Sequence, residues 1–214
     1  MQDKRTQSRI KTATLKVAVP FLGLTLLGAC ASQAPVAQVP EVLPVMAWDH
    51  AGPHTEEWTE ATLAALHADG AALLSEVPAD IATWCPGYVE APPSRRAAFW
   101  AGLLSALARF ESTWNPQAVG GGGQWFGLVQ IAPATARSYG CEADSGAELK
   151  DGAENLVCAV EIAARTVTRD GVVAAGGGGF AADWGPFASA DKREQMAEWV
   201  SSQSYCQPST SSAG

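Results

Sequence analysis

One acidic residue, Glu111, stands where a long apolar stretch of the sequence ends (ALARFE), and no other Asp or Glu follows until Glu142. A carboxyl group among apolar and aromatic side chains is costly to ionise, which raises its pKa and suits it to donate a proton near neutral pH. Glu111 is therefore a candidate general acid/base. The alternatives are that its side chain turns into water, or that it pairs with Arg109 or Arg137.

The residues before Glu111 have the pattern of a long buried helix. Residues 91–94 (APPS) are a typical helix start, with two prolines followed by a serine that can act as the N-cap. Apolar residues then recur at helical spacing over residues 99–110, and their neighbours widen the apolar surface almost all round. The pattern predicts a central helix that ends with Glu111 on an apolar face.

A glycine-rich turn and a short apolar piece follow Glu111. Four consecutive glycines, Gly120–Gly123, can bring the backbone close to a ligand. No Gly-Lys-Ser/Thr follows them, so a phosphate-binding loop is not indicated. After the apolar piece, residues 127–131, a brief helix is expected from Pro133 to Gly140.

The rest of the folded part is also expected to be helical. Apolar periodicity and capping residues predict helices from Thr55 to about Asp69, around Ala71 to Glu76, from Asp151 to about Arg169 and from about Asp191 onward. Asp151 with Glu154 has the spacing of a capping box. The sequence contains no convincing series of strands and no internal repeat, so it predicts one compact, mainly α domain.

The first 30 residues divide into a basic opening, an uncharged run over residues 17–29 and a cysteine. This layout is typical of a secretory signal, and the run is short for a membrane span of about 20 residues. The alternatives are an uncleaved anchor or a buried helix of the domain. Leu27–Cys30 resembles the lipobox of bacterial lipoproteins, which implies that Cys30 is lipidated. Ala31 and Ser32 follow it, with no Asp, and this favours the outer membrane, facing the periplasm.

These features divide the chain into four parts. We expect a signal peptide over residues 1–29, a lipidated Cys30 with a Pro/Ala-rich tether over 30–47, a domain over 48–206 and a disordered tail over 207–214. Without the signal peptide, which holds five basic residues and one acidic one, nine basic and 21 acidic residues remain, a net charge of −12. Such a chain is a poor nucleic-acid binder, because phosphates require a basic face. Its expected membrane contact is the lipid.

Apart from the lipobox cysteine, four cysteines remain. In an exported chain this indicates two disulfides, with three possible pairings. We favour Cys141–Cys158, which closes a short loop, and Cys85–Cys206, which ties the end of the chain back.

The sequence offers no good metal site, and no cofactor is expected. Zinc is a poor alternative to the disulfides, since no CxxC pair occurs and all three histidines lie at positions 50–67. His50 and His54 have the spacing of a metal-binding pair on a helix, but Pro53 between them would break that helix.

Three segments match the pattern of one family. Residues 108–116 (ARFESTWNP) resemble its E-S-x-x-N-P segment, and residues 127–136 (GLVQIAPATA) match its G-L-M-Q-[IV]-x-P-x-T-A segment. Asp151 with Asn155-Leu156 resembles its D-x-x-x-N-[IL] helix start. The family is that of the SLT-type lytic transglycosylases, in the lysozyme-like superfamily. The resemblance covers about residues 97–169 and implies a lysozyme-like domain that cleaves the β-1,4 bond between N-acetylmuramic acid and N-acetylglucosamine in peptidoglycan glycan strands.

Carried over to this sequence, the resemblance makes Glu111 the catalytic acid/base. It would protonate the glycosidic oxygen and then help the muramic 6-hydroxyl close onto the anomeric carbon, leaving a 1,6-anhydro end. Ser112 would hydrogen-bond the muramic acid or Glu111, and Gln130 would line the cleft beside Glu111. Gly127 and Leu128 would shape the floor of the cleft. Trp125 and Phe126 could stack on sugar rings, although single aromatic residues are more often core.

The sequence departs from the family pattern at two places. Val129 replaces the usual Met, which loses volume but keeps an apolar side chain. The usual A-Y-N-A-G segment, whose Tyr contacts the catalytic Glu, is not visible, and residues 176–187 stand where it is expected. Trp184 is the candidate to fill that space beside the substrate, although an indole can donate only one hydrogen bond.

The interval without acids after Glu111 bears on the reaction type. Ordinary glycosidases use two carboxylates, whereas an anhydro-forming enzyme uses the substrate's own hydroxyl and needs only one. The interval therefore favours a transglycosylase, unless Glu142, Asp144 or Asp183 folds into the site. The alternatives are a goose-type muramidase on the same fold and a catalytically weak peptidoglycan-binding lipoprotein.

Overall fold

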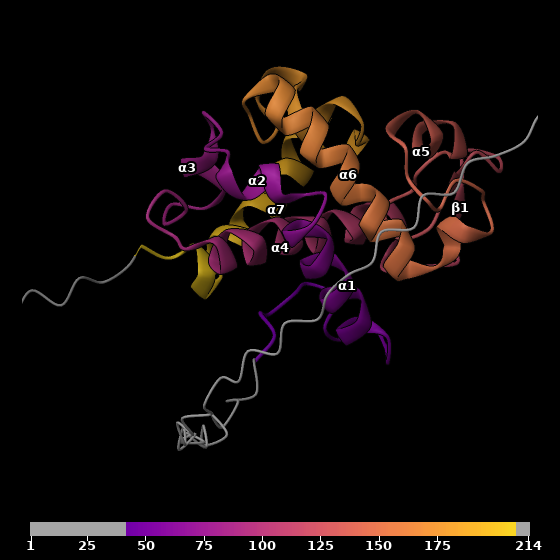
Figure 1. The fold of residues 1–214 in the computed structure, drawn as a ribbon, viewed down its shortest axis with the longest axis horizontal. Helices are drawn as coiled ribbons and strands as arrows, with labels where there is room; N and C mark the ends of the chain where they lie inside the picture. Colours follow the sequence, from indigo (N-terminus) through magenta and orange to yellow (C-terminus); the bar gives the residue numbers. More distant parts are fainter. Residues whose placement is uncertain (1–41, 209–214) are drawn as a thin grey trace, which may run out of the picture. The chain divides into compact units, whose positions relative to one another are not determined.

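Helices make up most of the computed structural model, which describes residues 42–208. The helices are α1 (Thr55–His67), α2 (Ala71–Ser75), α3 (Ile81–Trp84), α4 (Pro93–Ser112), α5 (Pro133–Tyr139), α6 (Gly152–Asp170) and α7 (Ala190–Ser201) (Figure 1). Short 3-10 turns are η1 (Glu148–Lys150), η2 (Ala175–Gly177), η3 (Gly179–Ala182), η4 (Gly185–Ala188) and η5 (Ser204–Cys206). The predicted mainly α fold is confirmed. None of the helices within these residues is long and apolar enough to cross a membrane.

Several predictions concern residues that the structure does not describe. The signal peptide, the lipidation of Cys30, most of the tether and the last six residues all lie outside residues 42–208.

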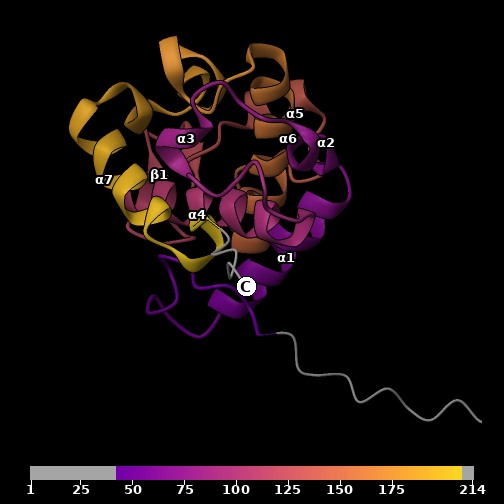
Figure 2. The same ribbon diagram turned by 90° about the vertical axis from the view of Figure 1, so that its left-hand side faces the viewer.

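Helix α4 runs through the centre of the domain, as its apolar pattern predicts. Every residue from Ala97 to Ala108 is buried, and α1, α2 and α7 pack around the helix (Figure 2). The helix begins two residues earlier than Ser94 would require as N-cap. Pro92 takes the N-cap position and Pro93 the first helical position, where the missing N–H of proline costs no hydrogen bond.

Helix α6 covers α1 and α2 and also contacts α5. Asp151 caps it, since its carboxylate accepts hydrogen bonds from the backbone N–H groups of Ala153 (2.9 Å) and Glu154 (3.2 Å). The capping box is only half formed, because the N–H of Asp151 donates to the carbonyl of Glu148 instead. Gly171 ends the helix in the left-handed conformation.

A two-stranded antiparallel hairpin follows α4, where the sequence predicted no strands. Strand β1 (Val119–Gly120) pairs with β2 (Trp125–Phe126). Gly121, at φ 56°, begins the turn between them, and the two glycines after it also have positive φ. The glycine run thus makes a hairpin that is too short to leave an alternating apolar pattern.

Both favoured disulfides are confirmed. Cys85–Cys206 joins the residue after α3 to the end of η5, and Cys141–Cys158 joins the segment after α5 to α6.

The residues just before α1 pack on the domain as a strap (residues 42–50). Met46 and Trp48 are buried. The N–H of Ala47 donates to the hydroxyl of Ser105 on α4 (2.9 Å), and the hydroxyl of Tyr205 donates to the carbonyl of Val45 (3.3 Å). The folded part therefore includes residues before Trp48.

Candidate active site

Glu111 lies in the last turn of α4, and its side chain is half-buried. Burial raises the pKa of its carboxyl group to about 7, and the nearby positive charge of Lys192 opposes this only in part. No group within residues 42–208 donates a hydrogen bond to this carboxyl. Neither alternative arginine pairs with it: Arg109 lies over the ring of Phe110, and Arg137 donates to the carbonyl of Asp144. The site thus holds a carboxyl group whose pKa is raised from its ordinary range toward neutral pH.

The chain turns sharply after Glu111 through two residues in the left-handed conformation. Thr113 has φ 53° and Trp114 has φ 58°, which residues with a Cβ rarely adopt. The indole N–H of Trp114 donates to the carbonyl of Ser105 (2.9 Å), and the ring of His50 meets the Trp114 ring edge-on at 4.7 Å. Between residues 42 and 208, Gln130 is the other non-glycine residue with positive φ. Such strain concentrates at functional sites because surrounding contacts must enforce it.

Ser112 joins the end of α4 to the apolar piece, which we call the floor loop (residues 127–131). Its hydroxyl donates to the carbonyl of Leu128 at 2.7 Å. This bond places the floor loop beside the residue that follows Glu111. The hydroxyl proton is therefore used within the protein, while the oxygen of Ser112 can still accept a hydrogen bond. Its predicted role toward muramic acid stays a prediction.

Asn155 of α6 fixes the floor loop from the other side. Its side-chain oxygen accepts from the N–H of Val129 (2.9 Å), and its amide nitrogen donates to the carbonyls of Phe126 (3.0 Å) and Leu149 (3.0 Å). The side chain is fully buried and uses both its donors and its acceptor. The sequence marked Asn155 only as part of the family pattern, and this contact explains why an asparagine suits the position.

Gly127 is required by the same contact. It has φ 83°, and a Cβ at this position would collide with the carbonyl oxygen of Leu149 and the amide of Asn155. Only glycine therefore lets the floor loop pass this close to α6.

Trp184 does not take the position that the sequence suggested for it. It is buried, and its indole N–H donates to the carbonyl of Val129 at 2.9 Å. Its single donor is therefore not available to Glu111, and its ring cannot contact a substrate. Leu128, a residue of the floor loop, is also fully buried, so its side chain anchors the loop in the core.

Gln130 connects the floor loop to the hairpin. Its amide nitrogen donates to the carbonyls of Gly127 (2.8 Å) and Ala118 (3.3 Å), and its side-chain oxygen lies against Gly120. The side chain is half-buried, so it braces this part of the site. Its predicted place in the cleft beside Glu111 stays a prediction.

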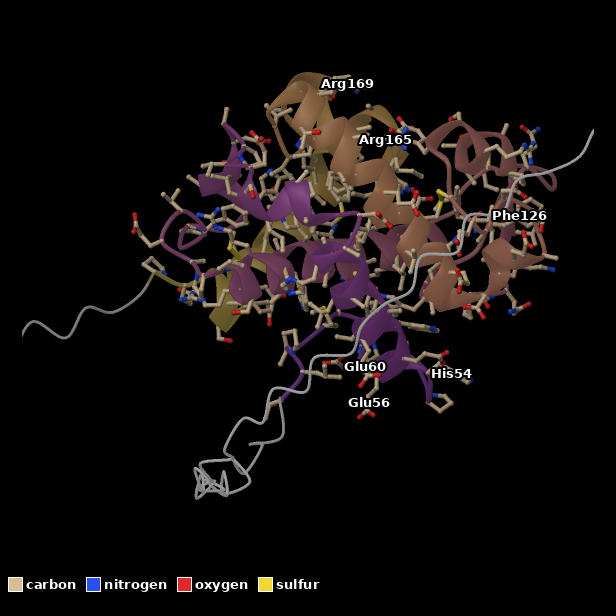
Figure 3. All side chains as sticks on the ribbon, in the orientation of Figure 1. His54, Glu56, Glu60, Phe126, Arg165 and Arg169 are labelled. Carbon is tan, nitrogen blue, oxygen red and sulfur yellow. A yellow bond between two sulfur atoms is a disulfide. The ribbon has the colours of Figure 1, made fainter. Side chains whose placement is uncertain are left out.

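The two aromatic residues of β2 differ in exposure. Trp125 is 45% exposed and lies against the backbone of Gly121. Phe126, labelled in Figure 3, is half-buried, and its ring lies against Gly146. Trp125 is therefore the more accessible of the two for stacking on a sugar ring.

The acids that could have formed a carboxylate pair with Glu111 have other surroundings. Asp183 accepts a hydrogen bond from the hydroxyl of Tyr139 (3.2 Å), and Glu142 lines a cavity together with Asp69 and Glu161. Among the described residues, the influences on the pKa of Glu111 are burial and Lys192, with no second carboxylate. The geometry therefore suits chemistry with one carboxyl group that donates and takes back a proton.

Comparison with known proteins gives one family model and several solved structures of similar fold. Residues 92–195 match the family model described as Transglycosylase SLT domain. The structure is similar to that of Bd0314 DslA: the wild-type form 2 has a TM-score of 0.70 and 28% sequence identity, and covers 78% of this chain and 100% of its own. Two glutamate-to-glutamine variants of Bd0314 DslA have TM-scores of 0.71 and 0.70, with 28% and 27% identity and the same coverage. No curated protein sequence matches the chain.

Proposed function

We propose that this chain, whose residues 92–195 match the transglycosylase SLT domain model, is a peptidoglycan lytic transglycosylase in which Glu111 is the general acid/base. The domain match supports a peptidoglycan-active enzyme of the lytic transglycosylase type. The observation that carries the finer proposal is Glu111 itself. Its carboxyl group is half-buried, has a pKa near 7 and has no hydrogen-bond partner among residues 42–208.

The proposed reaction uses this carboxyl group twice. Protonated Glu111 donates its proton to the glycosidic oxygen, and the bond from that oxygen to the anomeric carbon of muramic acid breaks. The carboxylate then accepts the proton of the muramic 6-hydroxyl while that oxygen bonds to the anomeric carbon. N-acetylglucosamine leaves with a new hydroxyl, a 1,6-anhydro ring forms, and Glu111 is protonated again. A pKa near the working pH serves both steps.

The protein's other contribution is to hold Glu111 in place. Because no described residue hydrogen-bonds its carboxyl group, its position depends on the backbone turn after α4 and on the floor loop. Asn155 accepts a hydrogen bond from the N–H of Val129, and Trp184 donates one to the carbonyl of Val129; together they fix that loop. Trp125, exposed on the hairpin, is the proposed stacking surface for a sugar ring.

Digestion of purified peptidoglycan sacculi tests the proposal. Wild type, Glu111→Gln and a matched control, Glu198→Gln on the exposed surface of α7, are compared, and the released fragments are identified by mass spectrometry. We expect 1,6-anhydro ends from wild type and the control, and at least a hundredfold less product from Glu111→Gln. Reducing ends would identify a muramidase instead, and release of no fragments at all would identify a wall-binding protein. Equal release by wild type and Glu111→Gln would end the proposed role of Glu111.

We also propose that the enzyme is lipid-anchored through Cys30, in the outer membrane and facing the periplasm. The support is the basic opening, the uncharged run and the Leu27–Cys30 lipobox resemblance. Several acyl chains on one residue hold a protein to a membrane far better than one chain does. We expect Cys30→Ser to move the protein from the membrane fraction to the soluble fraction. Unchanged membrane retention would refute lipidation at this cysteine.

A further inference from the structure

A groove of about 440 Å³ opens beside the last turn of α4, between the strap and α7. Its apolar wall comes from Phe110, Trp114, Met196 and Trp199, while His50 and Arg109 border it. We call this the aromatic groove. Figure 2 shows α7 alongside α4, and the packing of these two helices forms much of the groove. Phe110 directly precedes Glu111, and Lys192, which stands over the Phe110 ring, also acts on the Glu111 carboxyl, so the groove lies close to the proposed catalytic residue.

Two cations stand over the aromatic ring of Phe110, and of the two Arg109 lines the groove. The guanidinium carbon of Arg109 is 5.4 Å from the centre of the ring, and the ammonium nitrogen of Lys192 is 5.8 Å from it. Both side chains are exposed, and neither has an ion pair or hydrogen bond to any residue between 42 and 208. Other arginines of the domain are engaged: Arg96 and Arg193, for example, donate to backbone carbonyls.

Free positive charge is unusual in this setting, because the chain has a net charge of −8. With 22 acids in the sequence and 14 basic residues, carboxylates are plentiful, yet within the described residues none forms a salt bridge with Arg109 or Lys192, and Lys192 acts on the Glu111 carboxyl only at longer range. An apolar wall bordered by Arg109, with Lys192 close to the same Phe110 ring, is complementary to a flexible ligand that carries carboxylates on an otherwise partly apolar backbone.

We infer that the aromatic groove binds the peptide stem of the peptidoglycan strand, with the stem's carboxylates at Arg109 and Lys192. This inference rests on the proposed function, because the stem is attached to muramic acid, one of the two sugars at the bond that Glu111 would cleave. A bound strand therefore brings the start of a stem close to Phe110. The volume lies within the range of about 300–1,000 Å³ that is usual for small-ligand sites.

A sugar ring is a poorer occupant of the same groove. Sugars carry many hydroxyl groups, and the groove offers few polar partners, chiefly Arg109, Gln195 and His50. The apolar side chains of Met196 and Trp199 suit the aliphatic parts of a peptide instead, and aromatic and arginine residues are enriched where peptides and proteins bind.

The first test compares strands that carry stems with strands from which an amidase has removed them. Wild type is expected to cleave the stem-bearing strands more efficiently, and Arg109→Gln to lower this preference about fivefold, as for the loss of one exposed ion pair. Arg165→Gln is the matched control, since Arg165 is an exposed guanidinium on α6 that also stands over an aromatic ring, that of Tyr139 (Figure 3). It is expected to keep the wild-type preference.

The second test measures binding without cleavage. The free stem peptide released by the amidase is titrated calorimetrically into the Glu111→Gln protein. We expect binding that weakens at high salt, and about fivefold weaker binding when Arg109→Gln is added, but not when Arg165→Gln is added. Absence of stem binding, or an unchanged preference in Arg109→Gln, would overturn the inference. So would an equal loss on both kinds of strand, because Arg109 would then contact the glycan itself.

The two tests also separate this inference from the proposed function. If wild type releases 1,6-anhydro ends but does not bind the stem, the groove assignment fails and the enzyme assignment stands. If the stem binds with the expected dependence on Arg109 but no strand is cleaved, the groove assignment stands and the enzyme assignment fails.

Discussion

Replacing Glu111 by glutamine should change the stability of the protein in a way that depends on pH. In the folded chain, burial raises the pKa of the Glu111 carboxyl from its ordinary value of 4.5 to about 7. The folded state therefore holds this proton more tightly than the unfolded state. The stability that the group contributes is complete below pH 4.5 and is lost as pH rises through 7. Glutamine has nearly the same shape and never ionises, so it escapes this loss.

The size of the effect follows from the pKa shift and from exposure. At a pH above both pKa values, a shift from 4.5 to about 7 corresponds to a loss of about 3 kcal/mol in the free energy of unfolding. Because the side chain is only half-buried, screening by solvent reduces this to about 1–2 kcal/mol. At pH 5 the variant and wild type should differ by less than about 0.5 kcal/mol. At pH 8.5 the variant should be more stable, with a melting temperature roughly 3–6 °C higher.

The assay is thermal unfolding, followed by circular dichroism, of both proteins between pH 4.5 and pH 9. Glu198→Gln serves as the control because this residue lies on the exposed surface of α7, and its difference from wild type should not change with pH. A difference between Glu111→Gln and wild type that stays constant from pH 5 to pH 8.5 would show that Glu111 is not buried as described. The reasoning about its protonation in catalysis would then fail as well.

Three further predictions concern the proton donor, the floor loop and the disulfides. Cleavage should slow as pH rises through about 7, where Glu111 loses its proton. Because Lys192 lowers the pKa of Glu111, Lys192→Gln should move this decline to higher pH in a pH–rate profile. A decline at the same pH in both proteins would contradict this. Asn155→Ala should lower the free energy of unfolding in urea by about 3 kcal/mol because it leaves buried backbone groups unpaired. The control Asn115→Ala, at an exposed residue, should lower it by less than about 1 kcal/mol. Equal losses would show that the hydrogen bonds of Asn155 do not hold the floor loop in place. Replacing both cysteines of Cys141–Cys158, which are 17 positions apart, should lower the free energy of unfolding by about 3 kcal/mol. Replacing both cysteines of Cys85–Cys206, which are 121 positions apart, should lower it by about 5 kcal/mol. The reverse order in calorimetry would count against the loop-entropy account.

The helices that sequence patterns predict best are those whose signals are local. Helix α6 begins after Asp151 as expected, because its N-cap and apolar stripe lie within the segment itself. The last turn of α4 carries Glu111, also as expected from apolar spacing. The start of α4 was misplaced by two residues, since two prolines and a serine offer more than one way to begin a helix.

The features that sequence patterns missed depend on contacts between distant residues. The hairpin of two-residue strands and the short α3 are too brief to leave a period. The left-handed conformation of Trp114 is enforced by Ser105 and His50, which no local pattern indicates. The strap is another feature that local composition misses: its residues up to 47 have the composition of a tether, yet Met46 is buried in the domain.

The candidate site shows the same division. Glu111 could be identified from one segment, because an acid on an apolar face predicts a raised pKa by itself. The residues that fix the floor loop could not be identified in this way. The hydrogen bond from Trp184 to Val129 joins residues 55 positions apart. The indole therefore supports the loop's backbone, whereas the sequence suggested a place beside the substrate.

The hydrogen bonds of Asn155 and Trp184 to Val129 make one backbone amide a reporter of the site. Amides in surface loops usually exchange their hydrogen for deuterium quickly, because small local openings expose them. The N–H of Val129 is held by the buried side chain of Asn155, while the carbonyl of the same residue accepts from Trp184. Its exchange should therefore require separation of α6 from the floor loop, whereas the exposed Gly122 amide in the hairpin turn should exchange freely. The deuterium uptake of this short segment would then read out how often the floor loop separates from α6, in the absence of any substrate.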